Sequence, residues 1–214
     1  MYSGWPDLLP DKIELIAVQL PGREDRVFEQ PFTRLDRLVR TLAQAARIYL
    51  DKPFAIFGHS VGALIAFELA RELCGRFGAP IRHLFVSASP APQTICDAPT
   101  IHASATPEFK EALRRLEGTG PEILENEEIM ELLLPALRAD FRLSEEYVYR
   151  QQEPLPCSIT AFGGAADPRV TAADLEGWRI HTSGKFSISI VEGGHFFVTE
   201  TPRTVAGAIA AELL

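Results

Sequence analysis

The chain has 214 residues, enough for a single domain with a sizeable hydrophobic core. Its 46% hydrophobic and 23% charged residues are ordinary for a soluble globular protein, and no apolar run is long enough to span a membrane. The net charge of −8 argues against nucleic acid as a partner, because phosphates require a basic surface. The three cysteines cannot all pair and form no C-x-x-C motif, which favours the reducing cytoplasm; they are Cys74, Cys96 and Cys157.

The beginning of the chain predicts a strand and a helix. Residues 14–20 form an apolar-rich run of strand length that ends at Pro21 and Gly22, and a polar loop follows. Over residues 33–50 the apolar positions recur at helical spacing, which predicts an amphipathic helix with Thr33 as a candidate cap.

The next stretch places a serine between a predicted strand, residues 54–57, and a predicted helix that ends near Gly75. The residues at the junction have the spacing G-x-S-x-G; they are Gly58-His59-Ser60-Val61-Gly62. This pattern predicts a nucleophile elbow, a sharp turn that exposes the Ser60 hydroxyl, with Gly58 and Gly62 avoiding collisions with the crossing backbone. The Val61 N–H, at the helix start, is then a candidate donor to an oxyanion. The alternative is an ordinary strand-to-helix turn with a capping serine.

A helical insertion interrupts the pattern after the next predicted strand, residues 83–88. From about residue 91 to residue 156 the sequence predicts helices and no strand. One helix is expected over residues 107–117, another over 129–134, and Pro135 is expected to begin a third, because proline is tolerated in a first turn. Two interpretations remain open: a subdomain that seals the core, or a lid over a site.

Strands and helices alternate again in the last third of the chain. Strands are predicted over residues 158–162 and 186–191, and helices over residues 171–178 and 201–214. Strands joined by helices indicate a mainly parallel sheet with helices on both faces, an α/β fold in one domain spanning residues 1–214. In such a sheet the functional sites gather at the carboxyl ends of the strands, where Ser60 also lies.

A serine nucleophile needs a base to accept its proton and an acid to orient that base. His195 follows two glycines directly after the last predicted strand, so it is the candidate base. Asp167 follows the strand before and is the candidate acid, with Asp174 and Glu192 as competitors. The chain order serine, acid, histidine is the one expected for a hydrolase sheet of this kind.

The other titratable residues carry no comparable pattern. His59 should point away from Ser60, and His83 begins a predicted strand, at the opposite end of the sheet. His102 and His181 lie in polar or poorly patterned segments. Cys74 and Cys157 are interpreted as small core residues rather than thiol nucleophiles. Asp140 is interpreted as a solvated or capping residue. No residues have metal-ligand spacing and no glycine-rich loop resembles a nucleotide site, so no metal or cofactor is expected.

Several segments, in order along nearly the whole chain, resemble the type II thioesterases, stand-alone α/β-hydrolases that accompany nonribosomal peptide and polyketide synthases. The matching segments are Gln19-Leu20-Pro21-Gly22-Arg23, Phe57-Gly58-His59-Ser60-Val61-Gly62, Leu137-Arg138-Ala139-Asp140, the stretch from Phe162 to Asp167 with Trp178 beyond it, and Gly194-His195-Phe196-Phe197. The resemblance implies hydrolysis of acyl or aminoacyl thioesters on the phosphopantetheine arm of carrier proteins. It assigns Ser60, Asp167 and His195 to a catalytic triad and the insertion, about residues 91–156, to a lid around the pantetheine entrance.

One departure from the family concerns the N-terminus. The family begins with an earlier strand, between those matching residues 14–20 and 54–57, and a glycine-containing loop that supplies a second oxyanion donor. This sequence starts after them. Loss of one such donor costs roughly 2.7–4 kcal/mol of transition-state stabilisation.

Two rival functions remain open. One is an esterase or lipase acting on free esters. The other, suggested by the missing oxyanion loop, is a weakly active or non-catalytic binder of carrier proteins. The chain is expected to act as a monomer, without a membrane. Because carrier proteins are commonly acidic, a local basic contact is expected; its candidates are Arg34, Arg37 and Arg40, or Arg114 and Arg115. The alternative is that these arginines are simply solvated.

Overall fold

The computed structural model describes residues 2–94, 100–116 and 118–214. Cys96 and the end of the helix predicted for residues 107–117 therefore fall outside the described residues. By its internal packing the chain divides into two compact units: residues 1–17, 39–94 and 149–214 form the first, and residues 18–38 and 95–148 the second. In the described ranges no helix has the length and apolar character needed to cross a bilayer.

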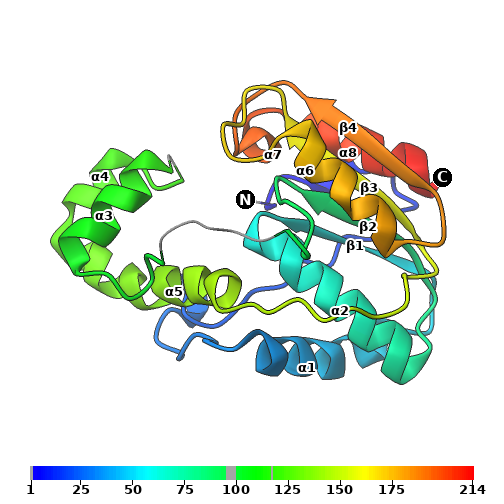
Figure 1. The fold of residues 1–214 in the computed structure, drawn as a ribbon, viewed down its shortest axis with the longest axis horizontal. Helices are drawn as coiled ribbons and strands as arrows, with labels where there is room; N and C mark the ends of the chain where they lie inside the picture. The colour runs from blue at the N-terminus through cyan, green and yellow to red at the C-terminus, as the bar shows by residue number, and fades with distance from the viewer. Residues whose placement is uncertain (1, 95–99, 117) are drawn as a thin grey trace. The chain divides into compact units, whose positions relative to one another are not determined.

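The first unit is built on a four-stranded sheet in the order β1-β2-β3-β4, in which every neighbouring pair is parallel (Figure 1). The strands are β1 (Phe54–His59), β2 (Ile81–Ser87), β3 (Ser158–Gly164) and β4 (Phe186–Val191). The predicted parallel sheet is confirmed. Each connection between strands of one parallel sheet must return the chain to the starting edge, so all four carboxyl ends lie along one edge.

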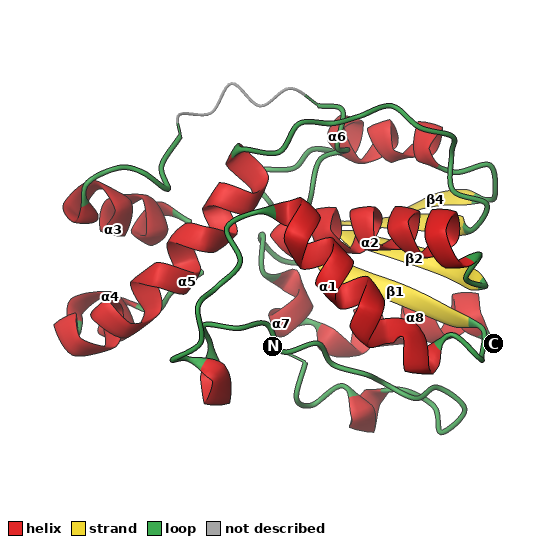
Figure 2. Cartoon of the chain, turned by 90° about the horizontal axis from the view of Figure 1, so that it is seen from below, coloured by secondary structure: helices red, strands yellow, loops and turns green. Residues whose placement is uncertain are grey.

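Helices cover both faces of this sheet, as the alternation of strands and helices predicts (Figure 2). One face packs against α2 (Val61–Phe77) and α6 (Ala172–Glu176), with Phe67, Leu84 and Trp178 in its core. The other face packs against α7 (Phe197–Glu200) and α8 (Pro202–Leu213), with Phe85 and Phe162 in its core. Short 3-10 helices complete the chain; they are η1 (Pro6–Leu8), η2 (Glu24–Arg26), η3 (Arg47–Tyr49) and η4 (Gly177–His181).

The strand predicted over residues 14–20 is wrong. This segment has no strand pairing, and Ile16 and Val18 are 45% and 61% exposed. A strand is held by a ladder of hydrogen bonds to a neighbour, and β1 pairs only with β2 among the described strands. Residues 14–20 have the apolar pattern of a strand, but none of them pairs with a strand among the described residues.

The predicted amphipathic helix over residues 33–50 is confirmed with shorter bounds. α1 (Leu35–Ala46) begins directly after Arg34, so Thr33 is not its cap, and η3 continues the chain as a tighter helix. Leu38 and Val39 are buried while Arg37 and Arg40 are exposed, which gives the predicted amphipathic pattern.

The second unit is helical. It contains α3 (Thr106–Arg115), α4 (Pro121–Glu125) and α5 (Glu127–Glu145), packed around Phe109 and Met130. The prediction that Pro135 begins a helix is wrong, because α5 runs through it without interruption. Proline removes one hydrogen bond from the helix interior. The buried residues Met130 and Ala136, on either side of that point, hold both halves of the helix in place.

Candidate active site

Ser60 occupies a strained turn between β1 and α2. Its φ of +54° and ψ of −123° are unfavourable for a residue with a side chain, as expected of a nucleophile elbow. A Cβ on Gly58 would lie 2.0 Å from the carbonyl oxygen of Gly62, so residue 58 must be glycine. The prediction that Gly62 is also needed to avoid a collision with the backbone is wrong, because a Cβ on residue 62 would meet nothing within 4 Å.

The side chains of the predicted serine, base and acid form one hydrogen-bonded chain. His195 Nε2 lies 3.1 Å from Ser60 Oγ, and His195 Nδ1 lies 2.8 Å from Asp167 Oδ2. The His195 side chain is 5% exposed and the Asp167 side chain 0% exposed, so their contact is shielded from water. This is the geometry in which a carboxylate orients an imidazole toward a hydroxyl.

Backbone contacts join the two loops that carry the acid and the base. Ala166 N donates to Gly193 O at 2.9 Å, and Ala165 N donates to Val191 O at 2.8 Å. A Cβ on Gly164, at the end of β3, would lie 2.3 Å from Gly194 O. The glycine at residue 164 therefore allows the two backbones to lie directly against each other.

The second oxygen of Asp167 is also held, because Arg169 N donates to Oδ1 at 2.9 Å. Burial lowers the pKa of His195, as does the positive charge of Arg169, whereas Asp167 opposes both effects. A lowered pKa keeps the imidazole neutral at neutral pH, which is the state able to accept a proton.

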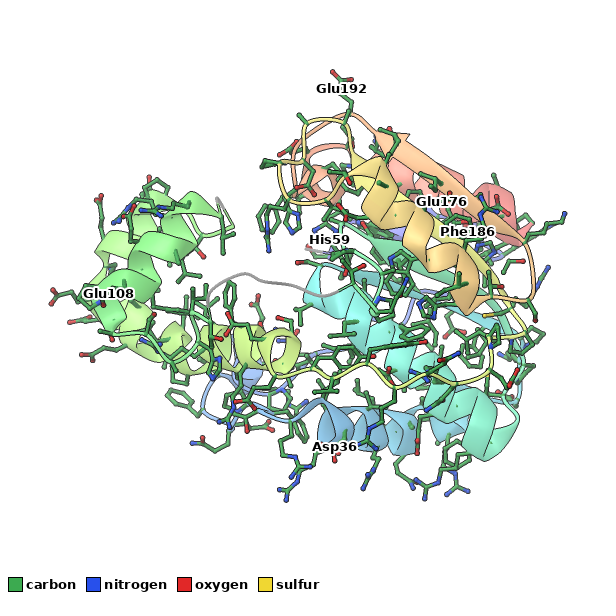
Figure 3. The ribbon with its side chains drawn as sticks, in the orientation of Figure 1. Asp36, His59, Glu108, Glu176, Phe186 and Glu192 are labelled. Atoms are coloured by element: carbon green, nitrogen blue, oxygen red, sulfur yellow. The ribbon has the colours of Figure 1, made fainter. Side chains whose placement is uncertain are left out.

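The competing carboxylates have other roles in the structure. Asp174 closes a capping box with Thr171 at the start of α6. Glu192 is exposed and points away from the strands (Figure 3). Asp140, in the second unit, is half-buried and is held in an ion pair, which differs from the solvated or capping role expected for it. Its Oδ1 accepts from Arg23 Nη2 at 2.8 Å, and burial raises its pKa while Arg23 opposes the rise.

The remaining histidines do not contact Ser60. His83 meets Thr160 inside the sheet, His181 is buried near Trp178, and His102 pairs with Glu145 in the second unit. His59 binds Ser87 instead of Ser60, but its ring centroid lies only 5.4 Å from that of His195. Sequence reasoning missed this proximity, because alternation along a strand gives no information about a loop that packs against its end.

The described cysteines and the candidate basic residues have structural surroundings of their own. Cys157 is buried, and burial raises its pKa to about 11, which disfavours a thiolate. Arg34 pairs with Asp36 in the structure. Arg114 and Arg115 both pair with Glu111. The charges of Arg34, Arg114 and Arg115 are thus partly neutralised by neighbouring carboxylates.

Comparison with known proteins identifies the family. The model of the thioesterase domain family matches residues 1–213. Linear gramicidin dehydrogenase LgrE of Brevibacillus parabrevis is 44% identical over 216 residues, which cover 100% of this chain and 82% of that protein. That name denotes a dehydrogenase, but none of the strand-to-helix turns in the described ranges carries the G-x-G-x-x-G pattern of a dinucleotide site.

Two solved structures have both the fold and the family in common with this chain. The type II thioesterase BorB from the borrelidin biosynthetic cluster is 40% identical, with a TM-score of 0.84 over 92% of this chain and 80% of that one. The RedJ thioesterase from the prodiginine pathway of Streptomyces coelicolor is 37% identical, with a TM-score of 0.90 over 99% of this chain and 80% of that one. The chain therefore belongs to the thioesterase domain family, as a serine-hydrolase thioesterase of type II, the kind associated with nonribosomal peptide and polyketide synthesis.

Proposed function

We propose that this chain hydrolyses acyl and aminoacyl thioesters on the phosphopantetheine arm of carrier proteins, with Ser60 as nucleophile, His195 as base and Asp167 as orienting acid. The observation that carries the proposal is the continuous hydrogen-bonded chain from Asp167 Oδ2 through His195 to Ser60 Oγ. Its members follow three different strands, so their meeting is not a consequence of sequence proximity.

The first half of the reaction forms an acyl-enzyme. His195 Nε2 accepts the Ser60 proton while Ser60 Oγ attacks the thioester carbonyl, and Asp167 stabilises the imidazolium. The oxyanion accepts a hydrogen bond from the N–H of Val61, which opens α2 and therefore has no acceptor one turn earlier in that helix. The pantetheine thiolate leaves and takes the proton from His195.

The second half restores the enzyme. His195, again neutral, accepts a proton from water, and the hydroxide attacks the acyl carbonyl. Ser60 Oγ leaves with the proton that His195 returns, and the free carboxylic acid departs. We assign the helical insertion the role of a lid at the pantetheine entrance, because the chain enters it directly after β2, whose carboxyl end faces the same edge as Ser60.

The proposal is tested by hydrolysis of one acyl group presented in three forms, on a carrier protein, on free pantetheine and as an oxygen ester. Ser60→Ala should lower kcat for the carrier-bound thioester at least about 10³-fold. Ser183→Ala, which removes the hydroxyl of an exposed residue in the same unit, should leave kcat unchanged.

Each rival function has its own outcome in this test. Preference for the oxygen ester would identify an esterase. A carrier-binding chain that no fluorophosphonate labels at Ser60 would identify a binder. Full activity of Ser60→Ala would refute the mechanism itself.

A further inference from the structure

His59 is a buried histidine that the proposed reaction does not use. It ends β1 directly before Ser60 and is 6% exposed. Its Nδ1 lies 2.9 Å from the hydroxyl of Ser87, which is 0% exposed and ends β2. The carbonyl oxygen of Ser87 also accepts from Ser60 N at 2.7 Å. One residue thus fixes both the histidine ring and the backbone of the nucleophile.

The far side of the His59 ring faces the loop that carries the base. Its centroid lies 5.4 Å from that of His195, 6.0 Å from that of Phe196 and 5.7 Å from that of Phe197. Nε2 is buried and has no hydrogen-bond partner among the described residues, although the His195 backbone is close enough to favour a proton on that ring. The buried ring thus lies against the segment that must hold His195 in place, and its Nε2 is free to face that segment.

We propose that His59 is a positioning residue, which holds His195 against Ser60 by packing its ring, with the proton on Nε2, against the backbone at residue 195. Ser87 Oγ then donates to Nδ1 and fixes the ring. The inference rests on the function proposed above, since it assumes that His195 is the base. His59 touches neither Ser60 Oγ nor the substrate in this role.

The charges around His59 are consistent with a neutral ring in this position. Burial lowers its pKa to about 4, and His195 and Arg169 lower it as well, whereas Asp167 raises it. These three groups come from the loops after β3 and β4. His59 therefore remains uncharged when His195 becomes an imidazolium, and the base does not meet a second positive charge.

Two substitutions of His59 distinguish the effect of its contact with Ser87 from the effect of its contact with the His195 segment. An asparagine amide reaches about as far as Nδ1 and a glutamine amide about as far as Nε2, so His59→Asn keeps only the contact with Ser87 and His59→Gln only the side toward His195. His59→Asn should lower kcat for acetyl-pantetheine by about 10- to 100-fold with little change in KM, because small displacements of a base have effects of this size. His59→Gln should recover part of that loss, because it restores the side toward His195 but not the contact with Ser87.

The pH profile distinguishes positioning from general damage. In His59→Asn water reaches His195, so the acid limb of kcat/KM should move to higher pH. The matched control is a second buried histidine-hydroxyl pair in the same sheet, His83 Nε2 and Thr160 Oγ1 at 2.8 Å. Thr160→Val should leave the limb in place, whereas Ser87→Ala should move it.

Each outcome decides the inference. A smaller loss of kcat in His59→Asn than in His59→Gln would overturn it, because the ring would then act through Ser87 alone. Parental kcat and an unmoved limb in Ser87→Ala would also overturn it, and that variant keeps the histidine if the His59 variants do not fold. These results differ from failure of the proposed function, in which Ser60→Ala retains activity and the position of His195 is irrelevant.

Discussion

Asp167 and His195 follow neighbouring parallel strands, and Asp167 Oδ2 lies 2.8 Å from His195 Nδ1 in a contact closed to water. The carboxylate holds the proton of the imidazole on Nδ1 and leaves Nε2 free to accept from Ser60.

Asp167→Asn should preserve the fold and lower kcat by about 10⁴-fold, because an amide can present its N–H to Nδ1 and stabilise the wrong tautomer. Steady-state hydrolysis of an acyl-pantetheine thioester measures this. The matched control is Asp174→Asn, which weakens the capping box of α6 without reaching His195. Equal losses in the two variants would contradict the assignment of the acid.

The activity should fall on acidification with a midpoint below pH 6.5, because burial first and Arg169 second lower the pKa of His195. The pH profile of kcat/KM reports this value for the free enzyme. Arg169→Gln removes one of the two lowering effects, so its midpoint should lie higher than that of the parent protein. A midpoint that does not move, or moves downward, would exclude the influence of Arg169.

Stability should decrease on acidification because of two buried histidines. Burial lowers the pKa of both His59 and His181 to about 4, against 6.5 in the unfolded chain. Between these values the unfolded chain binds more protons than the folded one, so this contribution to the free energy of unfolding is complete above about pH 7 and lost by about pH 4. Urea unfolding at several pH values measures the loss, and His181→Asn should make it smaller. An unchanged pH dependence in that variant would argue against a neutral, buried His181.

The two glycines of the elbow should differ sharply in their tolerance of alanine. Gly58→Ala would place a Cβ 2.0 Å from Gly62 O, and such overlap with backbone should cost about 3 kcal/mol of stability or more. Gly62→Ala has open space in the second position of α2, so it should be neutral or stabilising by up to about 1 kcal/mol. Thermal unfolding of both variants provides the comparison. Similar melting temperatures would show that the elbow can relax around residue 58.

Much of this site could be predicted from the sequence, because parallel strands bring their carboxyl ends to one edge. Ser60, Asp167 and His195 each follow a strand that the apolar pattern predicts, so their proximity required no knowledge of side-chain packing. The same reasoning failed for residues 14–20. A strand depends on a hydrogen-bonding neighbour, and periodicity within one segment does not report whether that neighbour is present.

The parts that could not be predicted depend on contacts between distant segments. Pro135 inside α5 is held by buried residues on both sides, a tertiary effect that overrides the local preference of proline. Local sequence patterns do not reveal the ion pair of Asp140, because its partner, Arg23, lies 117 positions away in the sequence. The position of His59 beside His195 belongs to the same class, because it is decided by how a loop packs against the end of a strand.

The direct backbone contact at Gly164 also bears on how the site opens. Because residue 164 has no side chain, the loops after β3 and β4 share hydrogen bonds at Ala165 and Ala166 and cannot separate one at a time. Their amide protons should therefore exchange with solvent together, in a single opening event. The acid and the base are in this sense one cooperative element, so partial opening of the molecule would remove both at once and would leave Ser60 in place without its base.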